Sequence, residues 1–259
     1  MLFTFSLYFC FSLFGLITFL YTMKIKEPLK LYANNLKHLA KRIYIRITVY
    51  IVEIIDGIHD ILLCGSLLAR HQEVNVKGAT DYSPTRYWAL DEIFKDAVFT
   101  NDDSMVDIGC GKGRVLVWYI NKHFPGQITG IEKDPNVAAI AKKWMTRHQN
   151  KKTRLVEGDA LEQSYNDYTF IYLFRPFNYE FFKQLILRLE SQITHPIQLY
   201  YLTDYYSKEF LTDRQGWKMK ERRLIYKKYG LYLSLVPQHY SIWTYNPHLN
   251  LGNYNSTGT

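Results

Sequence analysis

The stretch SMVDIGCGKGRVL, residues 104–116, decides the fold of this chain. Its first part, Met105–Ile108, is apolar and predicts a short buried strand. Gly109, Gly111 and Gly113 follow, and an apolar pattern typical of a helix comes directly after them. Glycines let a backbone turn sharply and approach a ligand closely, and the first turn of a helix has free N–H groups. The stretch therefore predicts a strand, a ligand-binding loop and a helix.

The spacing of the glycines distinguishes between the known classes of nucleotide-binding loop. A dinucleotide fingerprint requires a third glycine at position 114, which is Arg114. A P-loop requires Ser or Thr after its lysine, but Gly113 follows Lys112. The run D-x-G-x-G-x-G from Asp107 to Gly113 instead resembles motif I of the class I S-adenosylmethionine (SAM)-dependent methyltransferases.

Acidic residues end the next two expected strands. Glu132 follows residues 127–131 and lies 19 residues after Gly113, where an acid can accept hydrogen bonds from ribose hydroxyls. Asp159 and Ala160 follow residues 153–156. The resemblance implies that Asp159 holds the adenine amino group and that SAM is the cofactor. The cofactor-binding residues expected from motif and resemblance are Tyr82, Thr85, Asp107, Gly109, Gly111, Gly113, Glu132, Asp159 and Ala160.

The rest of the chain continues the alternation of strands and helices. Further strands are expected at residues 169–174, 197–202, near 219–227 and at 239–245, with helices at 135–145, 180–193 and 207–215. This order fits an α/β fold with a doubly wound, seven-stranded, mostly parallel sheet, the Rossmann-like methyltransferase type. In that fold the last strand is inserted antiparallel.

The segment before motif I carries a second resemblance. Residues 78–87 contain Tyr82-Ser-Pro-Thr85, similar to a Tyr-x-Pro-Thr segment in a group of poorly characterised bacterial methyltransferases. The resemblance implies a helical cap over residues 50–100, with Tyr82 or Thr85 at the cofactor. We predict four parts: an anchor at 1–23, a basic juxtamembrane and cap segment at 24–75, the methyltransferase domain at 76–248 and a flexible tail at 249–259.

The acceptor site is expected after the fourth strand of the domain. Related proteins often have Asn-Pro-Phe there, where Asn directs the lone pair of a target amine, but this chain has Arg175-Pro-Phe177. Arginine has no acceptor atom and stays protonated. Arg175 and Phe177 are the predicted catalytic residues; Arg175 either holds a carboxylate or phosphate of the acceptor or turns outward to pair with an acid. A basic cluster at 218–228 is either a solvated hairpin face or an anion-binding surface.

Charge and hydropathy are uneven along the chain. Residues 2–23 carry no charge and are long enough to span a bilayer, which predicts an uncleaved anchor over a signal peptide or a core helix. Residues 1–50 hold seven basic residues and one acid, so the positive-inside rule places the catalytic domain in the cytoplasm. Residues 30–46 are basic with apolar positions at helical spacing, as in a solvated or membrane-surface amphipathic helix.

Composition narrows the remaining functions. Cys10, Cys64 and Cys110 form no CxxC pair, so neither a disulfide framework nor a structural zinc site is expected. The net charge of +8 comes mainly from the N-terminal flank, and without an RNA-binding motif nucleic acid is not expected as a partner. We predict a membrane-anchored SAM-dependent methyltransferase that acts on an anionic or membrane-associated acceptor: a lipid, a lipid-linked precursor or a membrane protein. The alternatives are an inactive SAM-binding scaffold and a membrane-protein lysine N-methyltransferase.

Overall fold

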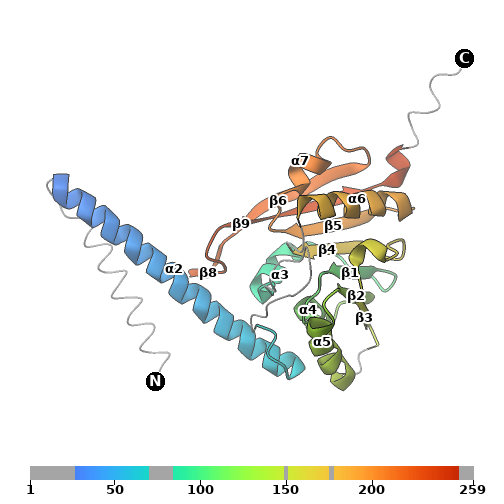
Figure 1. Cartoon of the computed structure of the whole chain (residues 1–259), viewed down its shortest axis with the longest axis horizontal. Helices are drawn as coiled ribbons and strands as arrows, with labels where there is room; N and C mark the ends of the chain where they lie inside the picture. The colour runs from blue at the N-terminus through green and yellow to red at the C-terminus, as the bar shows by residue number, and fades with distance from the viewer. Residues whose placement is uncertain (1–26, 70–83, 149–150, 175–177, 251–259) are drawn as a thin grey trace, which may run out of the picture. The chain divides into compact units, whose positions relative to one another are not determined.

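The computed structural model describes residues 27–69, 84–148, 151–174 and 178–250 (Figure 1). The predicted anchor at 2–23, Tyr82, Arg175, Phe177 and most of the predicted tail lie outside these residues. Within the described ranges, no helix combines the length and the apolar character that a membrane span requires. The anchor therefore stays a prediction.

The chain divides into two compact units. One comprises residues 1–52 and 227–235, and the other comprises residues 53–226 and 236–259. A single helix, α2 (Glu27–Cys64), begins in the first unit and ends in the second. The sequence pattern predicts only shorter helical segments in this region.

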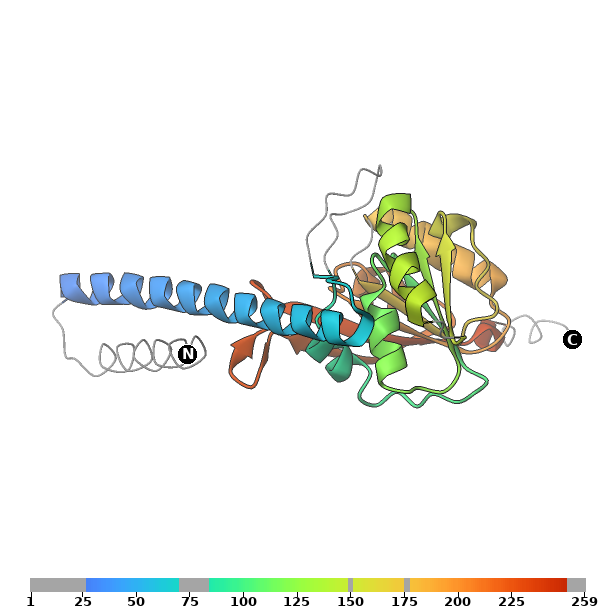
Figure 2. The ribbon, with the colours of Figure 1, turned by 90° about the horizontal axis from the view of Figure 1, so that it is seen from below.

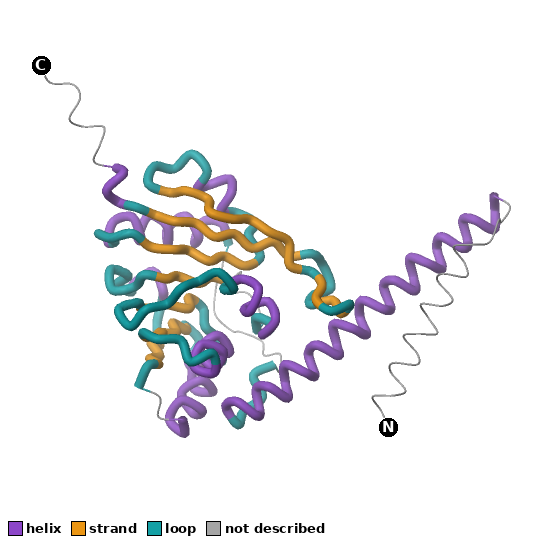
Figure 3. Tube along the Cα trace, turned by 180° about the vertical axis from the view of Figure 1, so that it is seen from behind, coloured by secondary structure: helices purple, strands orange, loops and turns teal. Residues whose placement is uncertain are grey.

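The second unit is built around one seven-stranded sheet (Figure 3). Its strands lie in the order β3-β2-β1-β4-β5-β9-β6. All neighbours from β3 to β5 pair in parallel, and β9 pairs antiparallel with both β5 and β6. The prediction of a mostly parallel sheet with the last strand inserted antiparallel is confirmed. The strands are β1 (Ser104–Ile108), β2 (Gln127–Glu132), β3 (Thr153–Glu157), β4 (Phe170–Phe174), β5 (Ile197–Leu202), β6 (Trp217–Ile225) and β9 (Gln238–Tyr245).

Helices connect the strands close to the predicted positions. Figure 1 shows α4 and α5 beside β2 and β3, and α6 beside β5. The bounds are α3 (Tyr87–Ile93), α4 (Arg114–Asn121), α5 (Pro135–His148), η1 (Ala160–Glu162), α6 (Tyr179–Gln192), α7 (Ser207–Leu211) and η2 (Pro247–Asn250). Asp134 caps α5, since its Oδ1 accepts the N–H of Asn136 at 2.8 Å. The predicted helix at 207–215 is too long, because the chain leaves α7 after Leu211 in a turn.

The two faces of the sheet are packed by different helices. On one face, apolar side chains of α6 such as Leu185 and Ile186 join a buried cluster with Ile171 and Leu199. On the other face, Phe94 stacks on Tyr200 with ring centroids 4.4 Å apart. The alternation of side chains along parallel strands places successive residues on opposite faces. The core is therefore double-sided, as a doubly wound fold requires.

The first unit combines the N-terminal part of α2 with a small hairpin. The hairpin consists of β7 (Lys227–Lys228) and β8 (Leu231–Tyr232). The hydroxyl of Tyr44 donates to the carbonyl of Gly230 at 3.1 Å, and the N–H of Tyr232 donates to Thr48 Oγ1 at 3.3 Å. Figure 2 shows α2 as one continuous helix.

Candidate cofactor site

The glycine loop joins β1 to α4 in a left-handed backbone. Gly109, Gly111 and Gly113 have φ angles of 75°, 56° and 84°, a region that side chains disfavour. A Cβ on Gly113 would lie 3.0 Å from Cζ2 of Trp144. The indole N–H of Trp144 donates to the carbonyl of Lys112 at 2.9 Å. Helix α5 thus holds the loop in place, and at Gly113 only a glycine fits without strain.

Glu132 ties the end of β2 to the glycine loop. Its Oε2 accepts the N–H of Gly111 at 2.8 Å, and its Oε1 accepts the N–H of Asp134 at 2.8 Å. Each carboxylate oxygen keeps acceptor capacity after one such bond. Burial raises the pKa of Glu132, although the backbone donors oppose that shift. The side chain is therefore held in place with lone pairs left for hydroxyl donors, which suits the role predicted for it.

Asp107 is a buried carboxyl group at the end of β1. Its side chain is 2% exposed, and among the described residues its Oδ2 has no hydrogen-bond partner. Burial raises its pKa well above the usual range, and the nearby charge of Glu132 raises it further. An orphaned buried acceptor is costly unless a ligand supplies the missing donor. The orphaned oxygen beside a glycine loop fits a cofactor that carries several hydrogen-bond donors, as SAM does.

Asp159 and Ala160 lie after β3, where the sequence pattern places them. Asp159 Oδ1 accepts the N–H of Leu161 at 2.9 Å, and Oδ2 pairs with Nζ of Lys133 at 2.6 Å. Burial alone would raise the pKa of Asp159, but the bonds from Lys133 and Leu161 outweigh it, so the pKa is lowered. Ala160 is buried and begins η1. The carboxylate of Asp159 therefore stays ionised and can accept hydrogen bonds, while its Oδ2 is ion-paired with Lys133.

Thr85 is placed by the sheet and by α4. Its Oγ1 shares a 2.8 Å hydrogen bond with the hydroxyl of Tyr172, and its carbonyl accepts from Nη1 of Arg114 at 3.3 Å. Arg114 is the first residue of α4, directly after the glycine loop. Thr85 thus contacts the residue that directly follows the loop. Tyr82, the other cofactor-binding residue predicted in this segment, lies outside the described residues.

Asp60 and Tyr87 complete this buried network, and neither was predicted from the sequence. The guanidinium of Arg114 pairs with the carboxylate of Asp60, and the hydroxyl of Tyr87 donates to Asp60 Oδ1 at 2.9 Å. An available signal was the pair Asp56 and Asp60, two acids one helical turn apart in an otherwise apolar stretch. Buried acids of this kind need a cation, and an arginine at a buried helix start can supply one.

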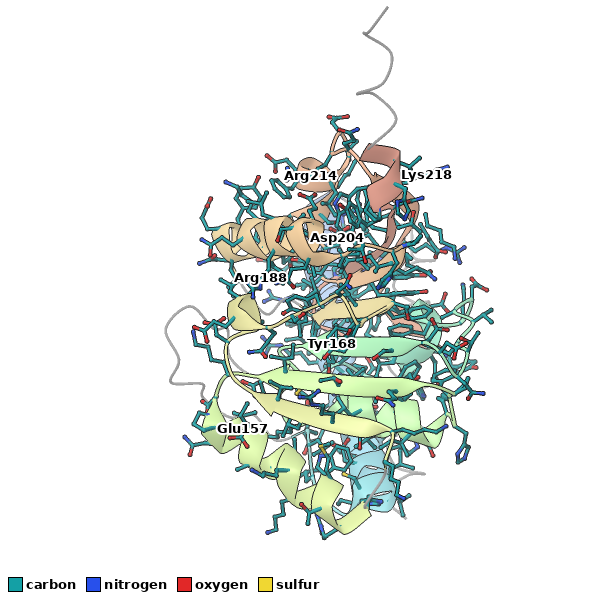
Figure 4. The ribbon with its side chains drawn as sticks, turned by 90° about the vertical axis from the view of Figure 1, so that its right-hand side faces the viewer. Glu157, Tyr168, Arg188, Asp204, Arg214 and Lys218 are labelled. Atoms are coloured by element: carbon teal, nitrogen blue, oxygen red, sulfur yellow. The ribbon has the colours of Figure 1, made fainter. Side chains whose placement is uncertain are left out.

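The basic cluster at 218–228 starts on the edge strand β6, as Figure 4 shows for Lys218. Arg222 is ion-paired with the buried Asp204 at 2.8 Å, and Arg223 with Glu221 at 2.6 Å. Part of the cluster is therefore engaged within the protein, and Lys218 and Lys220 are further exposed charges on this strand. This arrangement favours the solvated-face interpretation for the paired members.

Comparison with known proteins agrees with this site. Residues 105–189, which run from β1 into α6, match the family model described as a methyltransferase domain. These residues form a methyltransferase domain, and the protein is a SAM-dependent methyltransferase. Its cofactor is S-adenosylmethionine, for which the glycine loop and the acids at three strand ends provide a fitting cradle.

Solved structures with a similar fold include an RNA methyltransferase from Salinibacter ruber in complex with S-adenosyl-L-homocysteine. It has 18% identity and a TM-score of 0.48, and the match covers 63% of this chain and 94% of that one. A dimethyladenosine transferase from Plasmodium falciparum has 15% identity and a TM-score of 0.48, with 67% and 66% covered. No curated protein matches the sequence. These similarities concern the fold alone.

When bound, SAM supplies an activated methyl group on a sulfonium. The residues of this chain therefore need to bind the cofactor, orient the acceptor and exclude water. Glu132 and Asp159 are fixed acceptors at neighbouring strand ends, and Asp107 is a buried one. Among the described residues no side chain stands out as a general base at the ends of β1 and β4. Positioning therefore dominates the contribution of these residues to methyl transfer.

Proposed function

We propose that this methyltransferase acts at the cytoplasmic surface of a membrane on an anionic acceptor. The observation that carries the proposal is the place of Arg175 in the chain. β4 ends at Phe174 and pairs directly with β1, whose carboxyl end opens into the glycine loop. Ligands in such sheets bind at the carboxyl ends of the strands. Because Arg175 directly follows β4 in the sequence, we expect it at this edge of the sheet, where it can pair with a carboxylate or phosphate of the acceptor.

The membrane location rests on the uncharged residues 2–23 and on the basic flank after them. An anchor confines the enzyme to two dimensions and raises the effective concentration of lipids, lipid-linked precursors and membrane proteins. A lysine of a membrane protein is a second candidate acceptor, but Arg175 disfavours it because a guanidinium cannot accept a hydrogen bond from an amine. The remaining alternative is a scaffold that binds SAM without transferring its methyl group.

The direct test compares lipid and membrane-protein extracts of a deletion strain and its parent for the loss of one methyl-sized mass increment. With the acceptor in hand, Arg175→Asn is expected to lower kcat/KM ~10- to 200-fold while SAM affinity stays unchanged. Arg154→Asn, on the exposed side of the edge strand β3, is the matched control. Full activity of Arg175→Asn would exclude the anionic contact, and SAM binding without any methylated product would favour the scaffold.

A further inference from the structure

One side of the N-terminal part of α2 carries an exposed apolar stripe. It consists of Tyr32, Leu36, Leu39, Ile43 and Tyr50, which are 71%, 54%, 53%, 40% and 65% exposed. Steps of four, three, four and seven residues keep all five side chains on one side of a helix. At ~1.5 Å per residue the stripe is ~27 Å long. A soluble helix rarely leaves so regular an apolar row uncovered.

The opposite side of the same helix is already used within its unit. Tyr44 and Thr48 bind the hairpin at Gly230 and Tyr232, and the rings of Tyr44 and Tyr232 meet edge to face at 5.9 Å. Counted at ~100° per residue, Tyr44 and Thr48 lie more than ~100° away from the centre of the stripe. The hairpin therefore accounts for one side of α2 and leaves the stripe exposed.

Charge decides which partner fits the stripe. Residues 27–50 contain five basic residues and a single acid, Glu27. Arg42 and Arg46 are exposed and lie beside the stripe on the helical wheel. A second copy in parallel would bring these like charges together. The acids further along the helix offer an antiparallel copy little compensation, because Asp56 and Asp60 are buried and Glu53 already pairs with Arg86 at 3.7 Å.

We propose that the N-terminal part of α2 lies along an anionic phospholipid surface. The stripe enters the boundary between headgroups and acyl chains, and Arg42 and Arg46 extend to the lipid phosphates. Each basic side chain near such a surface strengthens binding ~5-fold. This contact does not depend on methyl transfer. It adds a second membrane contact to the anchor proposed at residues 2–23.

The test places spin labels on the full chain in vesicles of phosphatidylcholine with or without phosphatidylglycerol. Leu39→Cys reports the stripe, and Lys41→Cys, exposed and ~180° away, is the matched control. Cys64 and Cys110 are buried, and Cys10→Ser removes the remaining native thiol from labelling. In anionic vesicles the label at 39 is expected to collide mainly with oxygen and the label at 41 mainly with a water-soluble nickel chelate.

Equal access of the chelate to both labels would overturn the proposal. Dipolar coupling between labels at position 39 would also overturn it, because it would identify a second copy as the partner. Arg42→Gln with Arg46→Gln is expected to weaken the contact at 39 ~25-fold. Sedimentation with the vesicles reports the anchor separately: a chain that sediments while its label at 39 stays in water has an anchor and no α2 contact.

Discussion

Arg114 and Asp60 form a bidentate, buried ion pair. Nε of Arg114 donates to Oδ1 of Asp60 at 3.0 Å, and Nη2 donates to Oδ2 at 2.6 Å. The side chains are 2% and 0% exposed. Since Arg114 directly follows Gly113, this pair fastens the last turns of α2 to the helix that begins at the glycine loop.

Breaking this pair is expected to destabilise the protein strongly. Asp60→Asn leaves the buried guanidinium of Arg114 with Asp56 alone, whose Oδ2 lies 3.6 Å from Nη1, and the loss of the bidentate partner is expected to cost ~3–5 kcal/mol in the free energy of unfolding. Urea titration measures the loss. Glu157→Gln removes an exposed pair with Lys142 and is expected to cost less than ~1 kcal/mol. If both variants unfold at the same urea concentration, the buried pair contributes no more than a surface one.

The role of Glu132 is tested by SAM affinity. Glu132→Ala removes the acceptor for the ribose hydroxyls and the bond to Gly111, so affinity is expected to fall ~5- to 150-fold. Isothermal calorimetry measures it. Glu157→Ala is the matched control, because Glu157 lies opposite Glu132 in the register of β3 but is exposed and bonded to Lys142 of α5. An unchanged affinity in Glu132→Ala would contradict the assignment.

Asp107 makes stability depend on pH in a predictable direction. Burial holds its pKa in the folded protein well above the usual range, so the unfolded chain loses this proton first as pH rises. The unfolded state then binds fewer protons, and stability falls as pH rises from about 4, the ordinary pKa of an aspartate, towards the folded pKa. Asp107→Asn removes the ionisable group and with it this dependence. Its stability advantage over the wild type, measured by urea titration, is expected to grow from about pH 4 to about pH 7. A difference that does not change with pH would contradict the raised pKa.

Gly130 and Cys110 are expected to show coupled effects. A Cβ on Gly130 would lie 2.6 Å from Sγ of Cys110, closer than two atoms can pack. Gly130→Ala is therefore expected to destabilise the protein by ~1–3 kcal/mol through overpacking. The double variant with Cys110→Ala removes that sulfur and should recover part of the loss. A double variant no better than Gly130→Ala would place the strain elsewhere.

The proposed topology is tested with a reporter fused after Thr259. Cytoplasmic activity is expected because the basic flank follows the uncharged segment. Cleavage of the catalytic domain by a protease added outside the cell would contradict it. Deletion of residues 1–23 should release the protein from the membrane unless the basic residues 24–46 hold it there.

The sheet could be predicted because each strand is a local apolar run with a polar or glycine end. The same local signal predicted that Asp107, Glu132 and Asp159 lie at strand ends. Asp60 was not predicted, because its partner Arg114 lies 54 residues away and the pairing depends on tertiary packing. The full length of α2 was also missed, because Arg46 and Glu53 interrupt its apolar pattern while the helix continues through both.

The hairpin that binds α2 has a consequence for biosynthesis. Tyr44 leaves the ribosome 186 residues before its hydrogen-bond partner Gly230. At about 5–20 residues per second, α2 waits roughly 10 to 40 seconds for the hairpin that completes its unit. During that interval Tyr44 of α2 lacks the hairpin that later packs against it. The part of the chain that is synthesised first is therefore completed only near the end of synthesis.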